Sequence, residues 1–240
     1  MTPENEDSTP RVAIVTGGTR GIGRAVCEAL LDDGWEVFLC SRSADSVQDT
    51  LVELEQRVPG RAYGRTTDVR DEADVKGLVD WVAKQRDGID LLVNNAGLGI
   101  FGAVDELSSD DWHTVLRTNL DGAFYAMREV ARRMKQRGSG WIINICSLAS
   151  RNPFAGGAAY NASKFGLLGL SDAAMLDLRH DGIRVAAVLP GSVDTDFFDG
   201  PEESWRLQPE DVARAVADLV RYPNRALPSR IELRPSRPPK

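Results

Sequence analysis

The chain has 240 residues, of which 42% are apolar and 27% are charged, and its formal net charge is −7. This composition is typical of a globular protein with a large core, and the acidic balance argues against nucleic acid or an anionic membrane as a partner. A membrane span needs about 18 uninterrupted apolar residues, and no stretch of the sequence approaches that length.

The two ends of the chain differ in composition from the interval between them. Residues 1–9 are acidic and polar, and residues 236–240 are rich in proline, so we expect both to be tails, the first of them disordered. The start is unlike a secretory signal or a transit peptide, because no basic segment precedes an apolar core. No repeat or linker divides residues 10–235, which we expect to form a single domain.

Short apolar runs alternate with helical patterns along this domain. Strands are predicted over residues 11–18, 36–42, 62–69, 90–97, 140–147, 184–191 and 230–235. Helices are predicted over residues 21–34, 43–58, 71–87, 109–137, 159–181 and 209–222, with Asp71 and Ser109 as N-caps and Pro209 in a first turn. Strands that are apolar on both faces and alternate with helices indicate a covered parallel sheet. The predicted fold class is α/β: a single-domain, Rossmann-like, doubly wound parallel sheet of seven strands with helices on both faces.

The cysteines and histidines give no sign of a metal site. Cys27, Cys40 and Cys146 fall in apolar segments, so we expect reduced core residues in a cytoplasmic protein. His113 and His180 are the only histidines, and no Cys/His cluster is present in the sequence. We therefore predict no metal.

The first predicted strand runs into a glycine-rich turn, TGGTRGIG, at residues 16–23. Gly17, Gly21 and Gly23 allow a tight turn, the close approach of a pyrophosphate and close packing of the next helix. The alternative is an ordinary strand-to-helix turn. Because the spacing is G-x-x-x-G-x-G, the chain resembles the short-chain dehydrogenase/reductase family in its compact single-domain branch. The resemblance covers residues 10–235 and implies one dinucleotide-binding catalytic domain, with cofactor contacts in this loop from Gly17, Thr19, Arg20, Gly21, Ile22 and Gly23.

The second predicted strand ends at Ser41-Arg42 and bears on the choice of cofactor. Dinucleotide folds that prefer NAD usually carry an acid about 20 residues after the glycine loop, where it holds the ribose 2′-hydroxyl. Here no carboxylate repels a 2′-phosphate, and Arg42 is suited to bind one. Arg20 is similar to a second basic residue that is common in NADP-preferring members of the family. Two surface arginines are the alternative, and NADP(H) is the predicted cofactor.

Three later stretches are also similar to the family's cofactor site. In TDV, Asp68 and Val69 correspond to the pair that contacts the adenine ring, and NNAG at 94–97 corresponds to the segment along the cofactor, with Asn95 nearest the ribose. PGSVDT at 190–195 resembles the loop that grips the nicotinamide carboxamide. The cofactor contacts that this resemblance implies are Asp68, Val69, Asn95, Ala96, Gly97, Pro190, Gly191, Val193 and Thr195.

The segment SLASRNPFAGGAAYNASK at 147–164 carries the candidate catalytic residues. Tyr160 and Lys164 are four residues apart, so they project from one face of a helix, where a cation favours the phenolate and lowers the pKa of tyrosine. Ser147 ends the fifth predicted strand, and Asn119 lies in the helix predicted over 109–137. Together these four match the family's catalytic tetrad. The alternatives are a capping serine, a core tyrosine, a surface lysine and a helix-capping asparagine.

Chemistry suggests a role for each member of this tetrad. Tyr160 donates a proton to a carbonyl oxygen as hydride arrives from the nicotinamide, and accepts it in the reverse direction. Lys164 lowers the tyrosine pKa and holds the ribose hydroxyls, so both residues are also predicted to bind the cofactor. Ser147 hydrogen-bonds the substrate oxygen as negative charge develops. Asn119 fixes a water that links Lys164 to solvent.

Several loop residues bear on the substrate. An apolar or aromatic carbonyl compound is indicated by Leu148, Phe154, Phe197, Phe198 and Trp205, and plain loop packing is the alternative. Arg151 either contacts an anionic group or is an exposed loop arginine. Asp181 occupies a position where carrier-linked 3-oxoacyl reductases of this family often show a basic residue, which weakens the case for an acyl-carrier substrate.

The predicted function is an NADP(H)-dependent oxidoreductase acting on a small-molecule ketone or secondary alcohol, with a 3-oxoacyl substrate as one option. A sugar-nucleotide epimerase or dehydratase shares Tyr-x-x-x-Lys but normally has different glycine spacing and an extra domain. A non-enzymatic dinucleotide sensor is expected to lack part of the tetrad. We also expect a homodimer or homotetramer, because residues 165–178 are apolar around much of a helix and a second stripe runs through Trp112, Leu116, Leu120, Phe124 and Met127.

Overall fold

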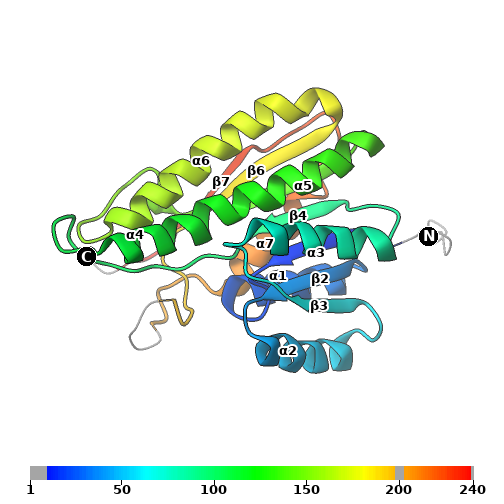
Figure 1. The fold of residues 1–240 in the computed structure, drawn as a ribbon, viewed down its shortest axis with the longest axis horizontal. Coiled ribbons are helices and arrows are strands. Elements are labelled where there is room, and N and C mark those ends of the chain that lie inside the picture. The colour runs from blue at the N-terminus through cyan, green and yellow to red at the C-terminus, as the bar shows by residue number, and fades with distance from the viewer. Residues whose placement is uncertain (1–9, 198–202, 239–240) are drawn as a thin grey trace.

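A computed structural model describes residues 10–197 and 203–238 of the chain. Within these ranges a parallel seven-stranded sheet has the order β3-β2-β1-β4-β5-β6-β7 (Figure 1). The predicted α/β fold class is therefore confirmed. The strands are β1 (Val12–Thr16), β2 (Glu36–Ser41), β3 (Ala62–Thr66), β4 (Leu91–Asn94), β5 (Gly140–Ile145), β6 (Ile183–Pro190) and β7 (Arg230–Leu233).

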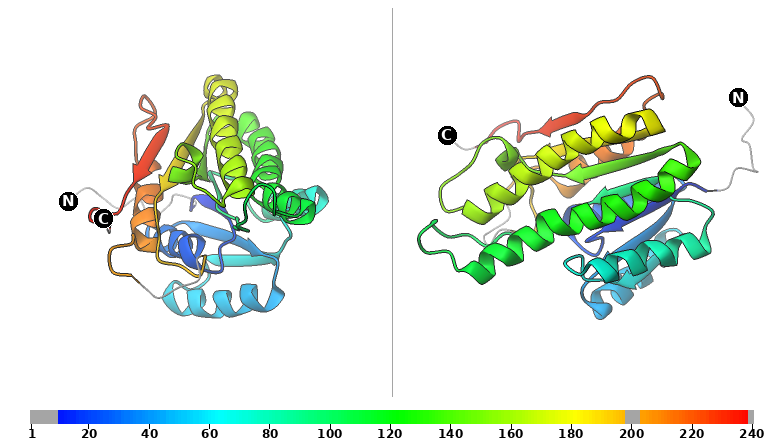
Figure 2. Two further views of the ribbon diagram at one scale, coloured as in Figure 1. Left: turned by 90° about the vertical axis from the view of Figure 1, so that its left-hand side faces the viewer. Right: turned by 45° about the horizontal axis from the view of Figure 1, so that its top comes forward.

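Helices cover both faces of the sheet, as Figures 1 and 2 show. On one face α1 (Gly21–Asp32), α2 (Ala44–Arg57) and α7 (Pro209–Leu219) bury their apolar residues in one core cluster. On the other face α3 (Glu72–Gln85), α5 (Gly122–Arg137) and α6 (Ala158–Leu178) share a second cluster. The shorter helix α4 (Ser109–Leu116) packs beside α6. Because both faces are covered, β1, β4 and β5 are buried along their whole length, which is why most of their residues are apolar.

Most helix ends agree with the capping residues that the sequence predicts. The Asp71 carboxylate accepts hydrogen bonds from the backbone N–H groups of residues 73 and 74, and Pro209 occupies the first turn of α7. The predicted N-cap Ser109 is wrong by one residue, because the Ser108 hydroxyl accepts from the Asp111 N–H at 3.0 Å. The two serines are adjacent, and the sequence pattern does not separate them.

The helix predicted over residues 109–137 is interrupted. A π-helical turn, Arg117–Asp121, separates α4 from α5, and the predicted residue Asn119 lies within it. Such turns insert an extra residue into a helix and are frequent at functional sites. The helix predicted over residues 159–181 also ends earlier than predicted: α6 ends at Leu178, and a 3₁₀ turn over Arg179–Asp181 leads to Gly182 at φ +74°.

The sheet order reverses between β1 and β4, so the loops after these strands separate and leave a crevice at their carboxyl ends. Elsewhere in the described ranges, Cys27, Cys40 and Cys146 are buried and unbridged, as expected of core residues. No group of three or more metal-binding side chains occurs among the residues that the structure describes. No helix of these ranges has the length and apolar character needed to span a bilayer.

Candidate active site

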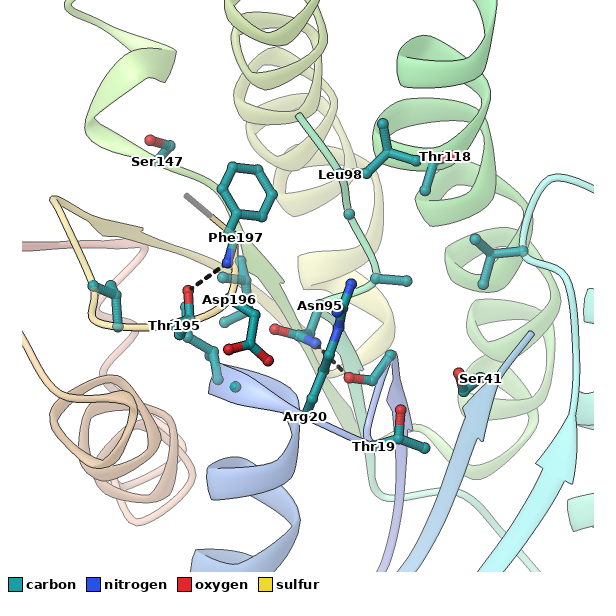
Figure 3. Close-up of a pocket in the computed structure, with 18 of the residues that line it drawn as sticks. Thr19, Arg20, Ser41, Asn95, Leu98, Thr118, Ser147, Thr195, Asp196 and Phe197 are labelled. Atoms are coloured by element: carbon teal, nitrogen blue, oxygen red, sulfur yellow. Dashed lines mark hydrogen bonds between the residues drawn. The ribbon is translucent and has the colours of Figure 1, made fainter. Parts of the chain in front are cut away.

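A cleft lies at the carboxyl ends of the strands, where loops from distant parts of the chain meet (Figure 3). Thr19, Arg20 and Ser41 lie toward one end of it, and Ser147 lies at the other. The predicted site residues that line the cleft are Gly17, Thr19, Arg20, Gly21, Ile22, Ser41, Arg42, Val69, Asn95, Ala96, Gly97, Ser147, Tyr160, Lys164, Pro190, Gly191, Val193 and Thr195. The predicted residues outside its lining are Gly23, Asp68 and Asn119.

The glycine loop between β1 and α1 closes on itself too tightly for other residues. Gly17 has φ +66°, and a Cβ on it would lie 2.9 Å from the Cα of Ala96. A Cβ on Gly23 would lie 2.1 Å from the Gly17 carbonyl oxygen, so Gly23 supports the loop from behind. Gly21 and Ile22 of the first turn of α1 line the cleft, and the N-cap residue Arg20 makes no side-chain capping bond, so this helix N-terminus is suited to an anion.

Asn95 ties this loop to the end of β4. Its Nδ2 donates to the carbonyl oxygens of Thr16 and Gly17, both at 3.0 Å. The Thr16 hydroxyl accepts in return from the N–H groups of Asn95 and Ala96, both at 3.1 Å. Asn95 lines the cleft while its amide positions the glycine loop, and its predicted place nearest the ribose stays a prediction.

The end of the cleft beyond the glycine loop is basic. Arg20, Ser41 and Arg42 line it. Asp68 directs its carboxylate to Arg70 at 2.5 Å, and its predicted contact with the adenine ring stays a prediction. That hydrogen bond to Arg70 lowers the pKa of Asp68, and the charge of Arg42 contributes in the same direction. Asp68 therefore stays ionised and paired outside the lining.

At the other end of the cleft, Tyr160 is 7% exposed. Burial raises the pKa of its hydroxyl, and a hydrogen bond with the Ser147 side chain opposes that rise. Ser147 is itself held in a capping arrangement, because its Oγ accepts from the Ala149 N–H at 3.1 Å and its N–H donates to Ser150 Oγ at 3.3 Å. The two hydroxyls thus converge on one point of the cleft.

Lys164 lies one helical turn beyond Tyr160 and is 6% exposed. Its Nζ donates to the Ile145 carbonyl oxygen at 2.9 Å and lies 5.8 Å from the centre of the Tyr160 ring. Burial lowers the pKa of the lysine. The sequence predicts that the lysine lowers the tyrosine pKa, but desolvation outweighs other influences here, so the Tyr160 pKa rises.

Asn119 lies in the π-helical turn, close to Lys164. Its side chain accepts from the Leu98 N–H at 2.8 Å and donates to the Leu98 carbonyl at 2.9 Å and to Ser163 Oγ at 3.0 Å. A Cβ on Gly97 would lie 3.3 Å from Asn119 Oδ1 and 3.7 Å from Lys164 Nζ. The asparagine therefore fixes the loop after β4 against α6, close to the lysine.

The residues expected near the substrate are only partly brought together. Phe197 lines the cleft, and Phe154 packs against the Tyr160 ring. Arg151 is paired with Glu232 at 2.6 Å, which agrees with the loop-arginine alternative. Leu148 packs against the chain at Gly191. Trp205 does not line the cleft, and its indole N–H donates to Glu203. Phe198 falls outside the described residues.

Sequence reasoning missed several residues of the site. Thr67, Leu98, Thr118, Cys146 and Asp196 line the cleft, and Phe101 packs on Tyr160. Leu98, Cys146 and Asp196 adjoin predicted motifs, so extending each motif by one residue would have found them. Thr67 is the first residue of TDV and Thr118 precedes Asn119, so the same extension reaches them, whereas Phe101 carries no such signal.

With this geometry in hand, the comparisons with known proteins identify the family. Residues 11–204 match the family model described as short chain dehydrogenase. The chain belongs to the short-chain dehydrogenase family and is an oxidoreductase of that family.

Individual relatives span nearly the whole chain. A Streptomyces coelicolor protein named "Putative ketoacyl reductase" is 36% identical over 92% of this chain and 86% of its own length. An alcohol dehydrogenase from the archaeon Thermococcus sibiricus, solved with 5-hydroxy-NADP, superposes with a TM-score of 0.89 at 28% identity, covering 97% of this chain and 100% of that one. A variant of actinorhodin polyketide ketoreductase, solved with NADPH, has a TM-score of 0.85 at 35% identity over 94% and 95% of the two chains.

Proposed function

We propose that this chain is an NADP(H)-dependent carbonyl reductase that interconverts ketones and secondary alcohols. The observation that carries the proposal is that the buried Tyr160 and the Ser147 side chain both line the cleft that the glycine loop also lines. One end of this cleft suits a phosphate-bearing dinucleotide, and the other holds an acid beside a hydrogen-bond donor.

The residues of the cleft fit NADP. The tight glycine loop leaves backbone space for a pyrophosphate, and Arg20 and Arg42 offer guanidinium groups to a 2′-phosphate. The acidic residue of the described lining is Asp196, which follows Thr195, whereas Asp68 is paired with Arg70 outside the lining. When bound, the nicotinamide supplies or accepts the hydride. Solved relatives of this chain with NADP or NADPH support the same choice.

The protein's own residues handle the oxygen and the proton. Ser147 and Tyr160 hydrogen-bond the carbonyl oxygen, and negative charge that develops there is stabilised by both hydroxyls. Tyr160 gives up its proton to that oxygen in reduction and takes it back in oxidation. Because burial raises its pKa, the hydroxyl is protonated at neutral pH, which suits the direction of reduction. Lys164 and Asn119 stand behind it, and we propose them as the route by which the proton is replaced.

Two relatives are named as a ketoacyl reductase and a polyketide ketoreductase, so a ketoacyl compound is one candidate substrate. Asp181, the residue that weakens an acyl-carrier substrate, forms an ion pair with Lys135 at 2.7 Å. Position 181 therefore offers an acid and its partner where those carrier-linked reductases show a basic residue. We propose a free small ketone as the substrate.

The experiment is a screen of ketones with NADPH and of secondary alcohols with NADP⁺, followed through the absorbance of NADPH. Turnover of any ketone that stops when Tyr160 is replaced by Phe is the expected result. If tight NADPH binding is found without turnover across the screen, the chain is a dinucleotide sensor instead.

We also propose that the protein is a homodimer or homotetramer. Phe165 and Leu176 on α6 and Phe124 on α5 are exposed, as the broad apolar pattern predicts. Part of the second stripe is internal, because Met127 is buried against the sheet. Light scattering at micromolar concentration is expected to give two or four times the chain mass, and a monomer mass contradicts this proposal.

A further inference from the structure

Phenylalanine rings from three separate loops surround Tyr160. Phe101 follows β4, Phe154 follows β5 and Phe197 follows β6. Their ring centres lie 5.8, 6.2 and 5.6 Å, respectively, from the centre of the Tyr160 ring, and Phe101 is 5.8 Å from Phe154 and 6.4 Å from Phe197. All five pairs are tilted or edge-to-face, which is the favoured arrangement of aromatic rings.

Glycines make room for these rings. A Cβ on Gly99 would lie 2.5 Å from Phe101 Cζ and 3.0 Å from Phe197 Cζ, so both rings rest on the bare backbone. A Cβ on Gly157 would lie 2.6 Å from the Phe154 ring. The rings are nevertheless not sealed in the core: Phe101 is 42% exposed and Phe154 is 43% exposed. The cluster therefore buries Tyr160 while it presents aromatic surface outward.

The charges of the cleft are distributed unevenly. Among its described lining residues, the cations are Arg20, Arg42 and Lys164, and we assign all three to the cofactor or the proton route. Asp196, which adjoins Phe197, is the acidic residue of the described lining. Arg151, the nearby loop arginine, is held by Glu232. An anionic substrate gains nothing at this end, whereas a neutral ring gains the aromatic contacts.

We propose that this cluster is a binding site for an aryl group and that the enzyme selects ketones with an aromatic ring on the carbonyl carbon. The proposal rests on the proposed function, because the carbonyl oxygen lies between the Ser147 and Tyr160 hydroxyls. The carbonyl carbon gains a hydride from NADPH, which is oxidised to NADP⁺, and the oxygen gains the tyrosine proton as the C=O π bond breaks. The aryl ring packs against the edges of Phe101 and Phe154.

The test compares two ketones that differ only in the ring, acetophenone and cyclohexyl methyl ketone. The measured quantity is kcat/KM for acetophenone divided by kcat/KM for cyclohexyl methyl ketone, both with NADPH. The two ketones differ in intrinsic reactivity, but that difference is the same for every variant, so a change of the ratio reports on the protein. An aromatic pair contributes about twofold to tenfold in affinity beyond the area it buries. We expect Phe101→Leu and Phe154→Leu each to lower the ratio by about that factor.

Two matched controls separate this effect from general damage. Tyr222→Leu replaces an aromatic residue of similar exposure, 46%, that lies near the start of β6, at the opposite end of the sheet. Gly99→Ala displaces the Phe101 and Phe197 rings without replacing either, and Gly102→Ala adds a methyl group to the same loop with its nearest contact 3.5 Å away. The ratio is expected to fall in Gly99→Ala and to stay unchanged in Tyr222→Leu and Gly102→Ala.

Binding is measured separately by saturation-transfer NMR on acetophenone in the presence of NADP⁺, a combination that cannot turn over. If ketones are reduced but the Phe101, Phe154 and Gly99 variants leave the ratio unchanged, the aryl site is overturned and the proposed function survives. A second outcome is that the wild type saturates the acetophenone ring but reduces no ketone, and that the saturation is lost in Phe101→Leu. This outcome supports the aryl site and overturns the proposed function. If the wild type shows neither turnover of any ketone nor saturation of the acetophenone ring, both the aryl site and the proposed function are overturned.

Discussion

The two ends of the cleft are built by different means. At the cofactor end, backbone and short polar side chains hold the shape: Asn95 bonds the carbonyls of Thr16 and Gly17, and Gly23 fits where no Cβ can. At the substrate end, aromatic rings from loops more than 40 residues apart meet over Tyr160, and Phe101 and Phe154 are both well exposed.

The two ends therefore differ in how much substitution they tolerate: the glycine loop tolerates little, and the aromatic loops tolerate more. A glycine loop that closes to within van der Waals contact tolerates almost no change, so it serves one ligand of constant chemistry. Exposed rings on loops can be exchanged without disturbing the sheet, so they set the choice of substrate. Tyr160 lies between the two ends, so its contribution to turnover should depend on both the cofactor loop and the aromatic rings.

The largest effect is expected from Tyr160→Phe. Because the phenylalanine keeps the ring contacts but loses the proton, kcat should fall by about 10²–10⁴-fold. The dissociation constant for NADPH, measured by fluorescence, should stay nearly unchanged, since the glycine loop and the arginines are untouched. Near wild-type turnover in a folded variant would mean that another group donates the proton.

Next in size is the change of cofactor preference in Arg42→Asp. A hydrogen bond to a charged group is worth about 1.5–3 kcal/mol, so the ratio of kcat/KM for NADPH over NADH should fall by at least about tenfold. Arg225→Asp makes the same change of charge at an exposed position after α7 and should leave the ratio alone. A wild type that prefers NADH contradicts the assignment, and so does an Arg42 variant with an unchanged ratio.

The smallest effect concerns stability, in Lys164→Met. Burial lowers the lysine pKa, so the fold bears a cost for the charged form at neutral pH, and the cost fades as the pH rises toward the unfolded value near ~10.4. Removing the charge should raise Tm at pH 7 by about 2–6 °C while turnover is lost, and the gain should shrink at pH 10. Calorimetry at both values measures it. A lower Tm at pH 7 would show that the Nζ bond to Ile145 outweighs the cost of burial.

The same contrast explains what could be predicted from sequence. Apolar runs locate every strand of the described sheet. The glycine loop and the Tyr160–Lys164 pair are local patterns of spacing, and Ser147 was predicted from the resemblance to the family. The π-helical turn at Asn119 was not predicted, because helical patterns lie on both sides of it and no residue type marks the turn itself. Phe101 was missed because its role depends on rings more than 50 residues away, and the rise of the Tyr160 pKa follows from that same packing.

The central claim is that the two ends of this cleft act on one reaction, and isotope transfer tests it most directly. The wild-type protein is incubated with acetophenone and NADPH deuterated at its transferable position, and the alcohol is analysed by mass spectrometry. We expect 1-phenylethanol that carries deuterium on the carbinol carbon, and none from Tyr160→Phe beyond a trace. Consumption of NADPH without deuterated alcohol, from this ketone or from cyclohexyl methyl ketone, would contradict the account.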